Sequence, residues 1–241
     1  MREKSEERGY VCDACGKEIF DYPNRRLCAA CEGSLECNEQ KTCPKCGRKT
    51  LADGVCLSCK SRMPKFTQGF SPFSYEGVAA GLVNKLKNGN RRLAFYLGEQ
   101  TCAYFLARAR DKIVGQELLI VPVPLSLSRL QERGYNQAEE LAKAIEKTLF
   151  KSGIQAKTDA DVLQKRRDAP PQKHLSGKER AENAIGAYHV HKRKLCDGKT
   201  VLLVDDILTT GATGGECAKL LLSSGASAVY FLTAASMPEK K

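Results

Sequence analysis

The chain has 241 residues, 42% of them hydrophobic, which is enough for one mid-sized domain and a smaller one. Its formal net charge of +11 favours anionic partners, a polyphosphate or nucleic acid, with a solvated basic surface as the alternative. No apolar run approaches the roughly 20 residues of a membrane span, and the start of the chain holds no apolar signal core, so we expect a cytoplasmic protein without membrane insertion.

The first 59 residues hold nine of the twelve cysteines, and eight of these form four Cys-x-x-Cys pairs. The pairs are Cys12 with Cys15, Cys28 with Cys31, Cys43 with Cys46, and Cys56 with Cys59. Two such pairs supply the four thiolates of a tetrahedral zinc site. A disulfide framework and redox-active pairs are the weaker alternatives, because no secretion signal or βαβ context accompanies the cysteines.

We therefore predict two structural zinc ions in a module over residues 1–63. The spacing leaves open whether the pairs combine in sequence or interleave. It also leaves open whether Cys37 is a free thiol or a substitute ligand. A region this short and polar is not expected to fold without metal.

Residues 64–241 are predicted to form the main α/β domain. Helical spacing predicts one helix over 77–88, with Gly89 as its C-terminal cap, and a second over 91–110. Basic side chains gather at the turn between these helices. We expect Lys87 to bind substrate there, the alternative being a solvated helix end.

A buried strand is predicted over residues 117–123 (ELLIVPV), and prolines on both sides of Val123 fix a rigid loop at its end. The next residues are rich in cations and lead into a helix that begins near Ala138. This arrangement predicts an anion pocket that contains Val123, Pro124 and Arg133. Farther on, a strand is expected to end near Leu163 and another to begin near Ile185, with a basic stretch between them.

The most informative run is VLLVDDILTTGAT, residues 201–213. Four apolar residues predict a buried strand that ends at Asp205 and Asp206, and an apolar helical segment follows over 216–222. The small-residue loop between them contains Thr209, Thr210, Gly211, Ala212 and Thr213. Backbone N–H groups of such a loop can hold a phosphate, and paired carboxylates can accept hydrogen bonds from neighbouring sugar hydroxyls. An ordinary strand-to-helix turn is the alternative.

This run closely resembles the signature of the type I phosphoribosyltransferases, which bind 5-phosphoribosyl 1-pyrophosphate (PRPP). The resemblance implies that Asp205 and Asp206 bind the ribose hydroxyls and that residues 209–213 surround the 5′-phosphate. It also implies that the loop at Val123 and Pro124, together with Mg²⁺, holds the pyrophosphate. Asp205, Asp206 and Arg133 are the residues expected to take part in catalysis.

The phrase VPVPLSLSRLQERGYNQAEELA, together with the cysteine pairs and the 201–213 run, resembles the ComF family of competence-associated proteins. That family joins an amino-terminal cysteine module to a phosphoribosyltransferase-like domain. The resemblance implies an open, mainly parallel α/β sheet preceded by a small zinc-ribbon-like domain. It also implies a mobile, basic loop between residues 158 and 190, which here offers Arg167, Gln172, Leu175, Arg180 and Asn183.

Two functions follow as hypotheses. The first is a ComF-type phosphoribosyltransferase-like protein that binds PRPP with Mg²⁺ and acts in DNA uptake during natural transformation. The second is a non-catalytic protein that binds single-stranded DNA and assembles with a ComFA-type ATPase. In either case the cytoplasmic protein could be recruited to the inner face of the membrane. Neither G-x-G-x-x-G nor a Walker motif occurs in the sequence, so we expect no NAD binding and no ATP hydrolysis by the chain itself.

Overall fold

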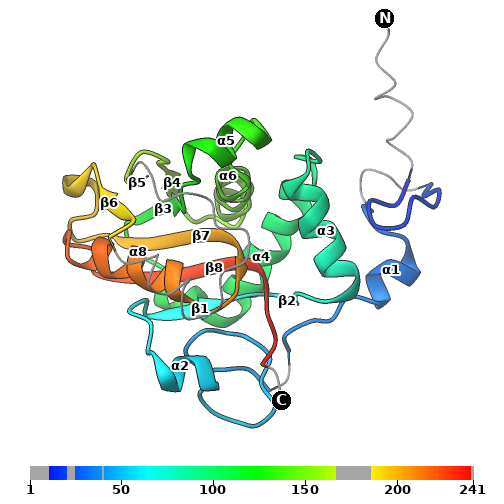
Figure 1. The fold of residues 1–241 in the computed structure, drawn as a ribbon, viewed down its shortest axis with the longest axis horizontal. Helices are drawn as coiled ribbons and strands as arrows, with labels where there is room; N and C mark the ends of the chain where they lie inside the picture. The colour runs from blue at the N-terminus through cyan, green and yellow to red at the C-terminus, as the bar shows by residue number, and fades with distance from the viewer. Residues whose placement is uncertain (1–10, 21–24, 40, 167–185, 240–241) are drawn as a thin grey trace, which may run out of the picture.

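The computed structural model describes residues 11–20, 25–39, 41–166 and 186–239. Its centre is a parallel sheet with the strand order β1-β8-β7-β3-β4, and β2 also pairs with β8 (Figure 1). The strands are β1 (Gln68–Phe70), β2 (Phe73–Ser74), β3 (Leu118–Pro122), β4 (Ala156–Thr158), β7 (Thr200–Leu208) and β8 (Ala228–Ser236). A separate antiparallel pair joins β5 (Leu163–Lys165) to β6 (Tyr188–Val190). The expected open, mainly parallel α/β sheet is confirmed.

Helices cover both faces of the sheet. The helices are α1 (Ala29–Gly33), α2 (Leu57–Ser61), α3 (Gly77–Lys87), α4 (Leu93–Ala109), α5 (Leu127–Arg133), α6 (Gln137–Lys151) and α8 (Ala212–Leu222), with single 3₁₀ turns at Arg110–Lys112 and Arg193–Leu195. Buried residues of α3, α4 and α6 share one core with one face of the sheet, and those of α8 share a second core with the other face. No helix in the described ranges could cross a membrane.

The central strand β7 shows why the sheet has two cores. Residues 201–204 of this strand are apolar without alternation, as expected for a parallel strand that is covered on both faces. Leu202 and Val204 belong to the core beneath α4 and α6, whereas Val201 and Leu203 belong to the core beneath α8. Successive side chains of a strand point to opposite faces, so this division follows directly from the sequence.

The predicted helices over 77–88 and 91–110 correspond to α3 and α4. Gly89, which follows α3, has a φ of +109°, which suits a glycine after a helix end. The boundary between residues 63 and 64 stays a prediction.

Three boundaries predicted from the sequence are wrong. The strand predicted over 201–204 continues to Leu208, so Asp205 and Asp206 lie within β7 rather than after it, and Asp205 pairs with Thr233 of β8. Helix α8 begins at Ala212 instead of near residue 216. Leu163 begins a strand rather than ending one. Ile185, where another strand was expected to begin, lies outside the described residues.

Candidate functional site

The paired acids lie near the carboxyl end of β7, where parallel strands of such sheets present ligand sites. Asp206 is buried, whereas Asp205 is partly exposed. The backbone N–H of Asp206 donates a hydrogen bond to Oδ1 of Asp205 at 2.8 Å. The two carboxylates therefore have different surroundings: that of Asp206 is enclosed by the protein, and that of Asp205 is partly accessible to solvent.

Two helices from distant parts of the sequence hold the carboxylate of Asp206. Nε2 of Gln137, the first residue of α6, donates to Oδ2 of Asp206 at 2.8 Å. Nζ of Lys87, the last residue of α3, lies 3.3 Å from the same oxygen. Gln137 is buried, and its Oε1 has no hydrogen-bond partner within the part of the chain that the structure describes. The structure thus brings the predicted Lys87 to the acids and adds Gln137, which the sequence analysis did not select.

Although Asp205 is partly exposed, the protein atoms packed around its carboxyl reduce its hydration, and together with the neighbouring Asp206 they raise its pKa to about 7. Lys165 of β5 and Lys87 act in the opposite direction, because their positive charges stabilise the carboxylate. Burial also lowers the pKa of Lys165, whose Nζ lies 5.5 Å from the centre of the Tyr188 ring. The small β5–β6 sheet therefore places a desolvated amine within electrostatic reach of Asp205. A carboxyl that titrates near neutral pH is a common property of functional sites.

Residues 209–213 are called the phosphate loop below, after the role that the sequence resemblance implies; they follow β7 and include the first two residues of α8. Gly211 has a φ of +81°, a left-handed conformation that glycine adopts without steric cost, and it is the N-cap of α8. Oγ1 of Thr210 accepts a hydrogen bond from the N–H of Ala212 at 3.3 Å. The loop thus ends at the amino end of an 11-residue helix, where N–H groups and the helix dipole favour an anion.

The loop after β3 adjoins the acids. The N–H of Val123 donates to the carbonyl of Val204 at 2.8 Å, and Nδ2 of Asn136 donates to the carbonyl of Val123 at 3.1 Å. Val123 therefore lies beside Val204, the residue before the paired acids, and the role of Val123 and Pro124 in holding a ligand stays a prediction. Arg133, at the end of α5, has one buried guanidinium nitrogen with no hydrogen-bond partner among the residues described. The structure shows no contact between Arg133 and either acid.

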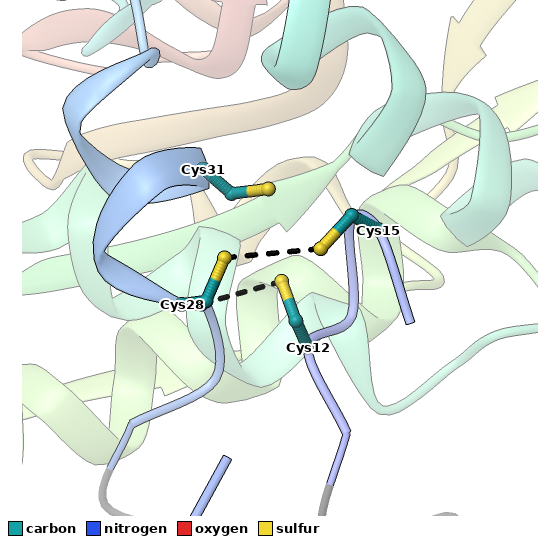
Figure 2. A group of neighbouring side chains, drawn as sticks. All are labelled: Cys12, Cys15, Cys28 and Cys31. Atoms are coloured by element: carbon teal, nitrogen blue, oxygen red, sulfur yellow. Dashed lines mark hydrogen bonds between the residues drawn. The ribbon is translucent and has the colours of Figure 1, made fainter. Parts of the chain in front are cut away.

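The eight paired cysteines form two groups whose members combine in sequence. The first cysteine cluster is Cys12, Cys15, Cys28 and Cys31, and the second cysteine cluster is Cys43, Cys46, Cys56 and Cys59. The ligand atoms within each cluster lie within 4.8 Å of one another, and Figure 2 shows the four sulfurs of the first cluster converging. This arrangement decides the question that the spacing left open. Cys37 belongs to neither cluster and is exposed.

Both clusters fit a zinc ion. A tetrahedral site with Zn–S bonds of about 2.3 Å places its sulfurs about 3.8 Å apart. Sγ of Cys15 lies 3.7 Å from Sγ of Cys28, and Sγ of Cys46 lies 3.7 Å from Sγ of Cys56. The donor set, four thiols at tetrahedral separations, is the one that structural zinc prefers, and with four protein ligands each site is closed to catalytic chemistry.

Most of the basic stretch between β5 and β6 lies outside the described residues. Arg167, Gln172, Leu175, Arg180 and Asn183 lie outside the described residues. The mobile loop that the resemblance implies there stays a prediction.

The chain is similar in sequence to known proteins over most of its length. Residues 99–241 match the family model of the phosphoribosyl transferase domain. The chain is 25% identical to the competence protein ComFC of Bacillus subtilis (strain 168), over 86% of this chain and 82% of that protein. It is 27% identical to the DNA utilization protein YhgH of Escherichia coli (strain K12), over 84% and 87%. It is 26% identical to competence protein F of Haemophilus influenzae, over 89% and 85%.

Solved structures resemble the chain only distantly. A hypoxanthine phosphoribosyltransferase from Staphylococcus aureus aligns with 61% of this chain and 76% of its own, at 15% identity and a TM-score of 0.35.

Proposed function

We propose that this chain, which belongs to the phosphoribosyl transferase domain family and is related to ComF-type competence proteins over most of its length, binds PRPP with Mg²⁺ at the carboxyl end of β7. The observation that carries the proposal is the placement of Asp205 and Asp206 directly before the phosphate loop and the amino end of α8. A short stretch of chain therefore joins a pair of carboxylates, which suit the sugar hydroxyls, to an anion site, which suits the phosphate. Ribose 5-phosphate carries both of these groups.

In this proposal each part of the site has its own role. Asp205 and Asp206 accept hydrogen bonds from the ribose 2′- and 3′-hydroxyls, and Gln137 and Lys87 hold Asp206 in place. The phosphate loop donates backbone N–H groups to the 5′-phosphate. Mg²⁺, when bound, neutralises the pyrophosphate beside Val123 and Pro124, and carboxylate and phosphate oxygens are ligands that suit it.

In a transfer reaction the bond between the ribose C1 and the pyrophosphate oxygen would break through an oxocarbenium-like transition state. The pyrophosphate would leave with the bonding electrons, and a nucleophilic atom of the acceptor would form the new bond to C1. No protein nucleophile is needed for that step. Arg133 is proposed to stabilise the leaving group, because one buried nitrogen of its guanidinium has no hydrogen-bond partner among the described residues.

Calorimetric titration with PRPP in the presence of Mg²⁺ tests the proposal. The wild-type chain should bind saturably, and the double variant Asp205→Asn/Asp206→Asn should not. Glu117→Gln is a control for the loss of acidic charge, because it removes a carboxylate just before β3, at the amino end of the strands and away from the paired acids. Equal binding by the double variant and the wild type would overturn the proposal.

We also propose that the chain acts in DNA uptake, because its relatives are named for competence and for DNA utilization. Direct binding of single-stranded DNA, with a ComFA-type ATPase as partner, is the second candidate, and the net charge of +11 favours it. Fluorescence anisotropy with a labelled oligonucleotide at several salt concentrations tests this candidate. Binding that weakens steeply with salt supports it, and no binding at low salt contradicts it.

A further inference from the structure

One buried arginine connects the second cysteine cluster to the phosphate loop. Arg48 follows Cys46 and Gly47, and only 5% of it is exposed. Its Nε lies 3.4 Å from Sγ of Cys46, and its Nη1 lies 3.5 Å from Oγ of Ser58, which lies between the last two ligands. Its Nη2 donates to the carbonyl of Thr209, the first residue of the phosphate loop. One guanidinium group therefore contacts both a cysteine of the second cluster, Cys46, and the first residue of the phosphate loop, Thr209.

This contact fixes the orientation of a peptide in the phosphate loop. A trans peptide is planar, and its C=O and N–H groups point in opposite directions. With the carbonyl of Thr209 held by Arg48, the N–H of Thr210 points away from the second cysteine cluster. The backbone N–H groups of this loop are the donors that a phosphate would use, so Arg48 acts on the loop without itself reaching the ligand.

The first cysteine cluster offers an internal comparison. It contains the same local sequence, Cys15-Gly16-Lys17 in place of Cys46-Gly47-Arg48, and Lys17 is exposed. The backbone bonds are also equivalent, because Cys12 donates to the carbonyl of Lys17 as Cys43 donates to that of Arg48. The two basic residues thus occupy the same position in two similar turns, and only Arg48 is buried against the phosphate loop.

We propose that Arg48 is a positioning residue that couples metal occupancy of the second cysteine cluster to phosphate binding at residues 209–213. A metal ion at that cluster holds Cys46 and the turn that carries Arg48, and Arg48 in turn holds Thr209. Loss of the metal frees the turn and, with it, the first peptide of the phosphate loop. The inference rests on the proposed function only for the identity of the ligand, because the contact itself is independent of any ligand.

The test compares Arg48→Ala with Lys17→Ala, and adds Arg48→Lys. Both alanine variants should retain two zinc ions per chain by elemental analysis. Titration with ribose 5-phosphate should show a dissociation constant about tenfold higher for Arg48→Ala, as expected for the loss of a charged hydrogen bond, and no change for Lys17→Ala. Arg48→Lys should not restore the wild-type value, because a lysine lacks the planar fork that spans Cys46 and Thr209.

Hydrogen exchange provides a readout that does not depend on any ligand. Amides of residues 209–215 should exchange faster in Arg48→Ala that still holds two zinc ions, and in the wild type after chelation, than in the zinc-loaded wild type. Unchanged exchange and unchanged affinity in zinc-loaded Arg48→Ala would overturn the role of Arg48. If the wild type binds neither ribose 5-phosphate nor PRPP while the exchange differences appear, the proposed function fails and the link to phosphate binding fails with it. Only the link between the second cysteine cluster and the order of residues 209–215 then stands.

Discussion

The two cysteine clusters share one local design and differ in their surroundings. In each, the N–H of the third cysteine donates to Sγ of the first, at 3.3 Å in the first cluster and 3.4 Å in the second. Each has a glycine directly after its second cysteine with nearly the same φ, +77° at Gly16 and +76° at Gly47. All four ligands of the second cluster are buried, whereas only Cys12 of the first is. The same metal-binding turn can therefore be largely exposed, with only Cys12 buried in the core beneath α4 and α6, or be enclosed with all four ligands.

The second cluster shares the core beneath α8 with the sheet, and several contacts hold it there. The N–H of Gly69 in β1 donates to the carbonyl of Lys45 at 2.8 Å. Near the carboxyl terminus, the carboxylate of Glu239 accepts hydrogen bonds from the N–H groups of Leu51 and Leu57. The second cluster thus contacts the beginning and the end of the main domain, and its metal is expected to support both.

Loss of a metal ligand should give the largest difference in stability between variants of the two clusters. Cys15→Ser and Cys46→Ser remove the second ligand of each cluster, one exposed and one buried. Structural zinc contributes folding energy directly, so each variant should lose about one zinc ion per chain. We expect Cys46→Ser to lower the melting temperature of the main domain by about 10 °C or more, and Cys15→Ser to lower it by a few degrees at most. Scanning calorimetry with zinc analysis measures both, and equal losses would contradict the comparison.

A glycine pair gives the next largest difference. Gly16→Ala and Gly47→Ala both place a Cβ at positive φ, which costs about 1–2 kcal/mol. A Cβ at Gly16 meets nothing within 4 Å, whereas at Gly47 it would lie 2.5 Å from the carbonyl oxygen of Gly69. Relief of that overlap requires backbone movement and adds about 1–3 kcal/mol. Urea unfolding should therefore show a larger loss of stability for Gly47→Ala, and a loss equal to that of Gly16→Ala would mean that the turn and β1 are not packed together.

The sequence predicted the local elements well because their causes are local. The buried strands followed from apolar runs, and the four Cys-x-x-Cys pairs followed from spacing alone. The full length of β7 did not follow from the sequence, because pairing with β8 is what continues the strand through Asp205 to Leu208. Without that partner, two acids and a threonine pair resemble the end of a strand.

The candidate site was predicted only where its residues lie in one motif. Asp205, Asp206 and the phosphate loop all lie within residues 205–213, so a single motif identified them. Gln137 and Arg48 lie 69 and 161 positions from their partners Asp206 and Thr209. Contacts over such separations depend on how α6 and the second cysteine cluster pack against the sheet, and no local pattern encodes that packing. For Gln137, its place in the R-G-Y-N-Q phrase was a signal that the sequence analysis left unused.

The pH dependence of ligand binding tests how far the influence of the second cluster extends. Burial and Asp206 raise the pKa of Asp205 to about 7, so its carboxyl is largely protonated at pH 6 and ionised at pH 8. A carboxylate accepts a stronger hydrogen bond from a sugar hydroxyl, so affinity for ribose 5-phosphate should rise about tenfold over this interval, beyond the change seen in Asp205→Asn. In the absence of ligand, the stability of the folded chain should instead fall as pH rises toward 7, because the Asp205 carboxyl ionises more easily in the unfolded chain.

Arg48→Ala should lower this affinity by the same factor at every pH and leave the midpoint unchanged, since Arg48 contacts the phosphate loop and not Asp205. Calorimetric titrations from pH 6 to pH 8 provide the comparison. A displaced midpoint in Arg48→Ala would mean that the second cysteine cluster also acts on the paired acids.

The smallest effect is expected where the first cluster meets the main domain. Nζ of Lys85 on α3 donates to the carbonyls of Asp13 and Ala14, at 2.8 and 2.7 Å, and Lys85 is exposed. Hydrogen bonds of this kind contribute about 1 kcal/mol or less at an exposed site. Lys85→Ala should therefore leave the melting temperature of the main domain within about 2 °C, while amides of residues 11–20 exchange faster. Lys112→Ala, which removes a single exposed bond to Gln68, is the matched control. A loss of ligand affinity in Lys85→Ala would show that the first cluster also reaches the site, because α3 ends at Lys87 beside Asp206.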